Sequence, residues 1–308
     1  MRIGLVLAGG VEPTSAVQLG VQAEAAGLSS FWMTEGISGD AFAVLAAAAT
    51  RTKRVALGTA IVSVFTRSLP LIGMATATLS RLSAGRFVLG LGASHREQVE
   101  GEHGLIFTSA RDRLEDAVEV VRRILSDGTI TDLHLRTTEI ARFNLGFSPL
   151  PVPVPIYLAA IGPKRVEFAW TKADGALVIW RTPAEVAALP VKHRREQVLA
   201  CILHCVVGES TLECEEALTA TRAQYAKRFD RYRRLFDAQP HQAGVICDGM
   251  DSIAARIAEY ERAGVDELLL LPIAAGQLSI EDAATRLMAF ANAAAPSRVV
   301  EQKEGGLQ

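Results

Sequence analysis

Residues 155–180 read PIYLAAIGPKRVEFAWTKADGALVIW, and this stretch contains one complete unit of the predicted fold. A short apolar run, Pro155 to Ala160, is followed by a segment that begins at Gly162-Pro163 and continues to Lys172; a second apolar run then begins at Gly175. Proline is accepted in the first turn of a helix, and continuous apolar runs are typical of parallel strands covered on both faces. The stretch therefore predicts a strand, a helix and a second strand parallel to the first.

Runs of the same kind recur along the chain, and segments with helical periodicity lie between them. One such segment, Arg111 to Leu125, has apolar residues at the spacing of a single helical face. Repeated right-handed crossovers of this kind close a sheet, so the sequence predicts a (β/α)8 TIM barrel. The alternative is a doubly wound open sheet, but Gly9-Gly10 after the first run does not supply the G-x-G-x-x-G expected there. The eight predicted strands are Ile3–Ala8, Ser30–Thr34, Val55–Thr59, Arg86–Leu91, Pro155–Ala160, Gly175–Trp180, Ala200–Val207 and Glu267–Pro272.

Three stretches interrupt this rhythm, at residues 61–70, 127–154 and 229–249, and are interpreted as insertions after strands 3, 4 and 7. Long connections in a barrel usually form lids or walls of a site, so we expect the last two to shape substrate choice. We expect residues 1–295 to form one barrel domain and residues 296–308 to be a flexible tail.

Composition excludes several classes of protein. The 308 residues are 49% hydrophobic and 21% charged, which argues against disorder. A net charge of −2 gives no excess of basic residues to neutralise the phosphates of a nucleic acid, and only 6% of the residues are aromatic, which argues against a surface for base stacking. The apolar runs are too short to span a membrane, and the run at Ile3 is too short for a signal peptide. Four cysteines without a CxxC pair indicate reduced thiols, and we expect a cytoplasmic location.

Candidate catalytic residues lie where the predicted strands end, because barrel active sites are found at the carboxyl ends of the strands. Glu35 follows strand two and can bind a ligand hydroxyl or act as an acid or base; a helix cap or a surface acid is the alternative. His95 follows strand four and is a candidate proton donor, although a structural histidine is the commoner case. Gly92, beside Ala93, would let a ligand approach the backbone.

The clearest candidate binding site lies after strand five, at Ile161-Gly162-Pro163-Lys164. A helix that begins here presents free N–H groups at the positive end of its dipole, and Lys164 and Arg165 add charge, which together favour a phosphate cradle; a capped helix with two surface cations is the alternative. Arg181, at the end of strand six, could meet a phosphate or carboxylate or be a solvated cation. Cys201 and Cys205 share one face of strand seven and His204 lies on the other, so no metal site is expected there.

Several segments, taken in order, resemble the luciferase-like flavin/deazaflavin oxidoreductase superfamily. They are Arg67-Ser68-Leu69-Pro70, residues 77–86 (ATLSRLSAGR), residues 89–94 (LGLGAS), residues 160–164 (AIGPK), Ala173-Asp174-Gly175 and residues 257–267 (IAEYERAGVDE). The Gly-Pro-Lys form and Thr66-Arg67 are more similar to members that use coenzyme F420 than to the FMN monooxygenases.

The resemblance implies a barrel with a redox ring at its mouth. The ring would lie against a bulge after strand three with a non-prolyl cis peptide, which matching places at Ser63-Val64. The cofactor phosphate would lie at Gly162 and Lys164. The family's Asp-His pair falls on Glu35 and Gly36, so the carboxylate is kept and the imidazole is lost. A family glutamate falls near His95, and a family asparagine near Gln98.

The sequence therefore predicts an F420-dependent oxidoreductase that transfers a hydride between the deazaflavin and a small organic substrate. The cofactor-binding residues would be Ser63, Val64, Gly92, Ala93, Ile161, Gly162, Pro163, Lys164 and Arg181. The alternatives are an FMN-dependent monooxygenase of the same superfamily and a non-catalytic cofactor-binding barrel. The resemblance also implies a homodimer. A basic run, 227–234, could attract an anionic substrate or the cofactor tail, although a solvated helix face is the commoner case.

Overall fold

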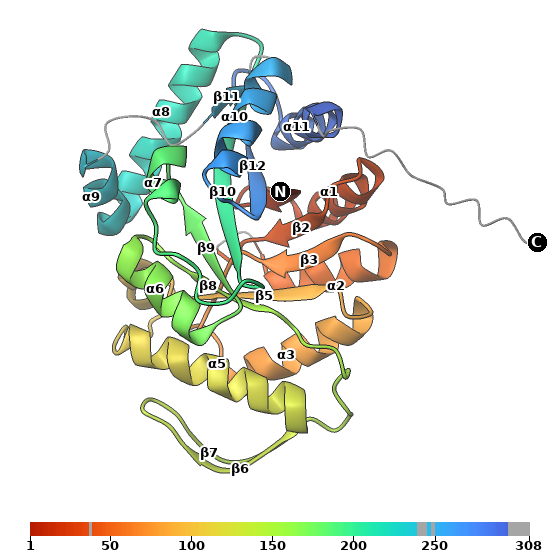
Figure 1. Ribbon diagram of the computed structural model, residues 1–308, viewed down its shortest axis with the longest axis vertical. Coiled ribbons are helices and arrows are strands. Elements are labelled where there is room, and N and C mark those ends of the chain that lie inside the picture. The colour runs from red at the N-terminus through yellow and green to blue at the C-terminus, as the bar shows by residue number, and fades with distance from the viewer. Residues whose placement is uncertain (37–38, 239–244, 248–249, 295–308) are drawn as a thin grey trace, which may run out of the picture.

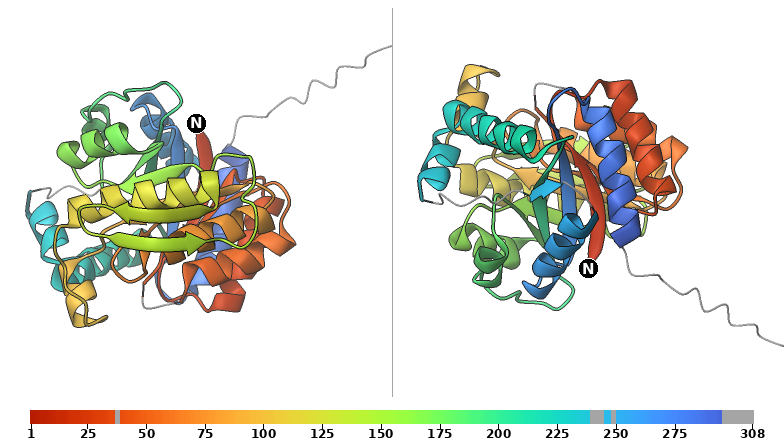
Figure 2. Two further views of the ribbon diagram at one scale, coloured as in Figure 1. Left: turned by 90° about the horizontal axis from the view of Figure 1, so that it is seen from below. Right: turned by 90° about the horizontal axis from the view of Figure 1, so that it is seen from above.

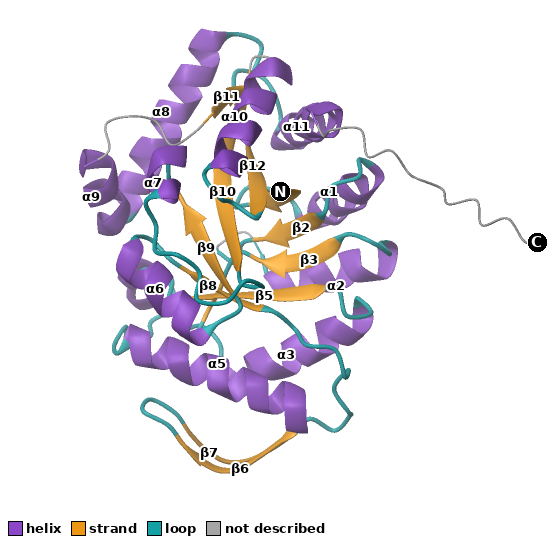
Figure 3. Ribbon diagram, in the orientation of Figure 1, coloured by secondary structure: helices purple, strands orange, loops and turns teal. Residues whose placement is uncertain are grey.

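The computed structural model describes residues 1–36, 39–238, 245–247 and 250–294, and its centre is a closed barrel of parallel strands (Figures 1 and 3). Each strand pairs with the next around the ring, and β9 pairs with β10 to complete the closure. Every predicted strand is present in the predicted order, so the barrel prediction is confirmed. In ring order the strands are β1 (Arg2–Leu7), β2 (Ser30–Met33), β3 (Ala56–Thr59), β5 (Phe87–Gly92), β8 (Ile156–Ala159), β9 (Gly175–Ile179), β10 (Val198–Val207) and β12 (Glu267–Ala274).

The barrel interior is filled by large side chains that face glycines on neighbouring strands. The rings of Trp32 and Tyr157 stack with their centroids 5.8 Å apart. A Cβ atom on Gly58 would lie 2.2 Å from the Trp32 ring, and one on Gly175 would lie 2.4 Å from the Tyr157 ring. Both distances are shorter than van der Waals contact, so glycine is needed at these positions for the interior to close.

Helices surround the barrel and cover its outer face (Figure 2). The predicted stripe on α5 is confirmed, because Leu114, Ala117, Val121 and Ile124 are all buried. The helices are α1 (Pro13–Ala25), α2 (Ala41–Arg51), α3 (Leu69–Leu82), α4 (Arg96–Gly101), α5 (Ala110–Asp127), α6 (Pro163–Lys172), α7 (Pro183–Ala187), α8 (Thr211–Arg228), α9 (Asp230–Ala238), α10 (Met250–Arg262) and α11 (Ile280–Ala294).

The interrupting stretches have different structures. Residues 61–70 contain a two-residue strand, β4 (Val62–Ser63), that pairs with β5. Residues 127–154 contain an antiparallel hairpin of β6 (Thr129–His134) and β7 (Glu139–Asn144), which lies on the outer side of α5 in Figure 1. The third stretch contains α9 and β11 (Val245–Cys247), which pairs with β10.

The hairpin does not form a wall of the site, so that expectation was wrong. It connects the end of α5 to the start of β8, which places its base at the amino ends of the strands. Its tip is tied to α5, because the Thr137 N–H donates to Asp116 Oδ2 at 2.7 Å. Neither strand of the hairpin contributes a residue to the cavity described below.

No helix in the described part of the chain is long and apolar enough to cross a bilayer. The predicted tail, residues 296–308, lies outside the described residues.

Candidate active site

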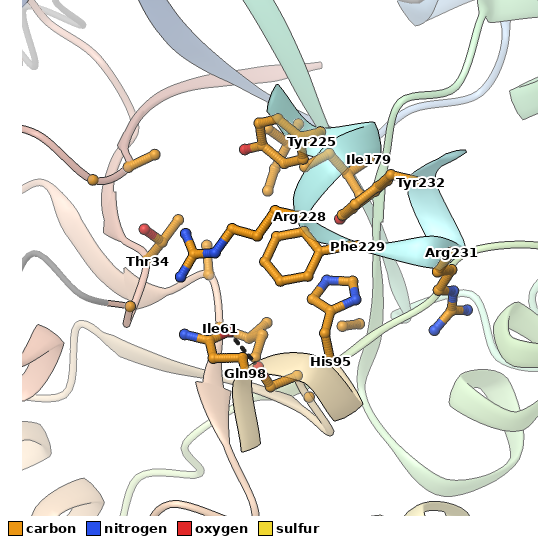
Figure 4. Close-up of a pocket in the computed structure, with 18 of the residues that line it drawn as sticks. Thr34, Ile61, His95, Gln98, Ile179, Tyr225, Arg228, Phe229, Arg231 and Tyr232 are labelled. Atoms are coloured by element: carbon orange, nitrogen blue, oxygen red, sulfur yellow. Dashed lines mark hydrogen bonds between the residues drawn. The ribbon is translucent and has the colours of Figure 1, made fainter. Parts of the chain in front are cut away.

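A cavity of about 1120 Å3 opens at the carboxyl ends of the barrel strands. Its walls come from the residues that follow β1, β2, β3, β5 and β8, and its far side comes from β9, β10 and β12. The corner between α8 and α9 covers it (Figure 4). Its position agrees with the general location of active sites in this architecture.

One wall is an apolar shelf formed by Ala60 and Ile61, between β3 and β4, and the peptide bond between them is cis. The expectation that placed this bond at Ser63-Val64 was wrong. Ser63 pairs with Gly92 in the sheet, and the Val64 N–H donates to the Gly92 carbonyl at 3.0 Å. These two residues belong to the barrel wall behind the shelf, and neither lines the cavity.

The glycines of β5 make room for the shelf. A Cβ on Gly90 would lie 1.9 Å from the Thr59 carbonyl oxygen, and one on Gly92 would lie 2.6 Å from Ile61 Cδ1. Gly92 and the following Ala93 both line the cavity. The glycine pattern therefore reflects close packing against the β3 end, in addition to the access for a ligand that the sequence predicts.

Glu35 lines the cavity but is held in an ion pair. Arg67 donates from Nε and Nη2 to the two carboxylate oxygens of Glu35 at 3.1 and 2.8 Å, and Nη2 also lies 2.8 Å from Asp40 Oδ2. Hydrogen bonding to Glu35 is the main cause that raises the pKa of Arg67. A carboxylate engaged by both oxygens is better suited to fix the loop and a ligand's polar edge than to exchange protons.

His95 also lines the cavity, at the start of α4, where its imidazole stacks on Phe229 with a centroid distance of 4.0 Å (Figure 4). Burial lowers its pKa to about 4, and the charges of Arg231 and Arg228 contribute. The imidazole is therefore neutral near pH 7. It can offer an N–H to a ligand there, and its role as a proton donor remains a prediction.

The predicted phosphate cradle begins α6, with Gly162 as the N-cap at φ 100° and Pro163 in the first turn. Gly162 provides no side chain to cap the helix, Pro163 has no N–H, and the Arg165 N–H donates to the Gly162 carbonyl at 3.1 Å. The Lys164 N–H is therefore the amide of the first turn that remains for a ligand. Ile161 and Arg165 line the cavity, whereas Gly162, Pro163 and the exposed Lys164 do not. Of the two cations predicted at this site, Arg165 is therefore the one that faces the cavity.

Two more arginines gather at this helix start. Arg231 lines the cavity and donates to the Ile161 carbonyl at 3.2 Å. Arg181 lies behind, with Nη2 3.7 Å from the position a Cβ on Gly162 would occupy. Burial lowers the pKa of Arg231, and the charges of Arg165 and Arg181 lower it further. Arg181 is ion-paired with Glu185 at 3.1 Å and does not line the cavity. Arg165 and Arg231 are therefore the two guanidinium groups that line the cavity beside this helix start, an arrangement suited to an anion.

The α8–α9 corner supplies three arginines of the basic run 227–234 to the cavity, together with aromatic residues that the sequence does not single out. Arg228 reaches over the cavity in Figure 4 and donates to Glu102 at 2.6 Å, while Phe229 and Tyr232 pack on His95. The basic run 227–234 was the available signal. It was weighed as a solvated face, but Arg228, Arg231 and Arg234 of this run line the cavity.

On β10, the predicted alternation of faces is confirmed. Cys201 and Cys205 lie in the outer core, and His204 lines the cavity from the opposite face. Burial raises the pKa of the Cys201 thiol to about 12, as expected for a packing residue.

Comparison with known proteins is consistent with this geometry. Over 160 residues, covering 51% of this chain and 46% of the relative, the chain is 31% identical to the 5,10-methylenetetrahydromethanopterin reductase of Archaeoglobus fulgidus. It is 31% identical over 179 residues to the F420-dependent glucose-6-phosphate dehydrogenase of Amycolatopsis mediterranei, covering 53% of this chain and 52% of that protein. The chain thus matches about half the length of these curated relatives.

A solved structure of an F420-dependent secondary alcohol dehydrogenase in complex with an F420-acetone adduct has the same fold. It superposes with a TM-score of 0.79 at 18% identity, covering 94% of this chain and 98% of the other. A family model described as luciferase-like monooxygenase matches residues 1–294. The chain therefore belongs to the luciferase-like monooxygenase family.

Proposed function

We propose that this protein is an oxidoreductase that binds coenzyme F420 in the cavity and acts on a small organic substrate beside it. The observation that carries the proposal is the convergence of Arg165 and Arg231 in the cavity beside the start of α6, with Arg181 behind them in an ion pair with Glu185. The names of the F420-dependent relatives support the choice of coenzyme.

The residues present fit both parts of such a coenzyme. The apolar shelf of Ala60 and Ile61, opened by the missing side chain of Gly92, suits one face of a planar ring. Arg165 and Arg231, beside the start of α6, suit a phosphodiester. Arg234, farther along α9, also lines the cavity and can meet a longer anionic arm. When bound, the deazaflavin would supply a carbon that gives or takes a hydride.

The protein would supply position and exclusion of water. The α8–α9 corner closes over the cavity, since Arg228 pairs with Glu102 and the Asp230 N–H donates to Glu97 at 3.2 Å. The bidentate Glu35–Arg67 pair fixes the loop at the opposite edge. These contacts would hold the ring and the substrate in register, and positioning of this kind is a large contribution to catalysis.

A titration of the apo-protein with F420 and with FMN, followed by fluorescence, tests the proposal. We expect saturable F420 binding and at least about tenfold weaker FMN binding, because the longer anionic arm meets more of the arginines. Comparable binding of both, together with oxygen consumption on reduced FMN, would assign the chain to the flavin monooxygenases instead. Failure to bind F420 would refute the proposal.

A further inference from the structure

The proposal concerns His204, a buried residue to which neither the sequence nor the site described above gives a function. It lies on β10, where Ile202 and His204 face the cavity while Cys201 and Cys205 face the helices. The side chain is 1% exposed. It is therefore part of the cavity wall and has little contact with solvent.

The imidazole is packed on its faces but has no partner for its edge. It stacks on the indole of Trp180, with centroids 3.6 Å apart and planes 16° apart, and the ring of Tyr225 meets it edge-on at 5.8 Å. Among the described residues, neither Nδ1 nor Nε2 has a hydrogen-bond partner. Burial lowers the pKa of His204 to about 3, and the charge of Arg222 lowers it further, so the neutral ring offers one donor and one acceptor.

Buried polar atoms are nearly always hydrogen-bonded, and leaving both ring nitrogens without partners is costly. Trp180 covers one face of the imidazole, and His204 belongs to the lining of the cavity. Its two nitrogens are buried, so a ligand in the cavity reaches them after a small movement of the side chain. Ile179, Ile202 and the ring of Tyr225 give this side of the cavity a largely apolar or aromatic lining, to which α8 adds two polar side chains, Thr221 and Gln224.

The barrel order places His204 opposite the apolar shelf. The ring runs β1, β2, β3, β5, β8, β9, β10 and β12, so β10 is four strands from β3 in either direction. A planar ring that lies on Ala60 and Ile61 therefore turns its other face toward β10. A substrate stacked on that face would lie between the ring and His204.

We propose that His204 is a specificity-determining residue that hydrogen-bonds the carbonyl or hydroxyl oxygen of a substrate whose remaining body is apolar or aromatic. This assignment rests on the proposed function, because the position of the ring defines which face the substrate occupies. His204 would act by binding and orientation, and the other ring nitrogen would be satisfied by water.

A matched pair of probes tests the hydrogen bond. Acetophenone carries a carbonyl oxygen where α-methylstyrene, of almost the same shape, carries a CH2 group. Dissociation constants for both are measured by NMR titration on wild-type protein, first without cofactor and then saturated with F420. The variants are His204→Phe, which keeps the aromatic stacking, and His204→Gln, which keeps a donor and an acceptor. His134→Phe, at an exposed histidine on the distant β6–β7 hairpin, is the control.

Wild-type protein, the control and His204→Gln are expected to prefer acetophenone by about threefold to tenfold, the range of one net neutral hydrogen bond. His204→Phe is expected to bind both probes equally. In wild-type protein, acetophenone should also shift one 15N signal of the His204 ring, a measurement that needs no variant to fold. An unchanged preference in His204→Phe, no preference in wild type, or no binding of either probe at millimolar concentration would overturn the proposal. F420 binding is measured separately, so a failure of the proposed function is recognised independently.

Discussion

Two neighbouring cations at the start of α6 provide a sharp test of how the anionic arm is bound. Arg165 lines the cavity beside Arg231, whereas Lys164 is exposed and outside it. Arg165→Gln removes a hydrogen bond between charged groups, worth about 1.5–3 kcal/mol. Because Arg165 is half-buried, we take the lower part of this range, which corresponds to about a tenfold loss of F420 affinity. Lys164→Gln removes the same formal charge from an exposed position, where less than about a threefold loss is expected.

Both variants are measured by fluorescence titration with F420 at low and at high salt. The effect of Arg165→Gln should persist at high salt because a direct contact is lost, and the smaller effect of Lys164→Gln should disappear because it is screened. Thermal melts check that neither change unfolds the protein. If Lys164→Gln cost as much affinity as Arg165→Gln, or more, the assignment of the cradle to the cavity-facing guanidiniums would be refuted.

Three further changes test other parts of the structure. Gly92→Ala should push the Ile61 side chain into the cavity and weaken F420 binding by about tenfold. Gly101→Ala is the control, because a Cβ atom there meets open space, and it should leave F420 affinity unchanged in the same fluorescence titration. The pKa of His95 is about 4 in the folded protein against an ordinary value of 6.5, so the free energy of unfolding falls as pH falls through that window, by up to about 1.4 kcal/mol per pH unit. Urea denaturation should show this part of the pH dependence missing in His95→Phe. Glu267 is 3% exposed and accepts hydrogen bonds from Ser30 Oγ at 2.5 Å and from Arg2 at 2.7 Å. Glu267→Ala should therefore lower the free energy of unfolding by about 3 kcal/mol, and an unchanged melting temperature would contradict this.

The barrel was predictable because its signal is local and repeated. Each buried parallel strand needs a continuous apolar run, and each crossover helix needs one apolar face. The run that became β9 and the stripe on α5 both follow this rule. The β6–β7 hairpin was missed because its exposed positions interrupt the apolar pattern, and turn and proline residues at its ends were interpreted as a loop.

The site was predictable only in part. The helix start at Gly162 follows from local chemistry, but which of two adjacent cations enters the cavity depends on the rotation of α6, which packing determines. The shelf at Ala60–Ile61 depends on contacts with Gly90 and Gly92, nearly thirty residues away in the chain, so the expected position was off by three residues. The role of the α8–α9 corner depends equally on tertiary contacts.

The hairpin gives this barrel a third layer on one side. Buried side chains of β6 and β7, among them Ile130, Leu133 and Ile140, join the same apolar cluster as the inner face of α5. One helix of the outer ring is thereby enclosed between two sheets, although helices of this ring normally face water. Substitutions along this edge would change the stability of the fold and leave the cavity unchanged. Stability and catalytic activity can therefore evolve on separate parts of one chain.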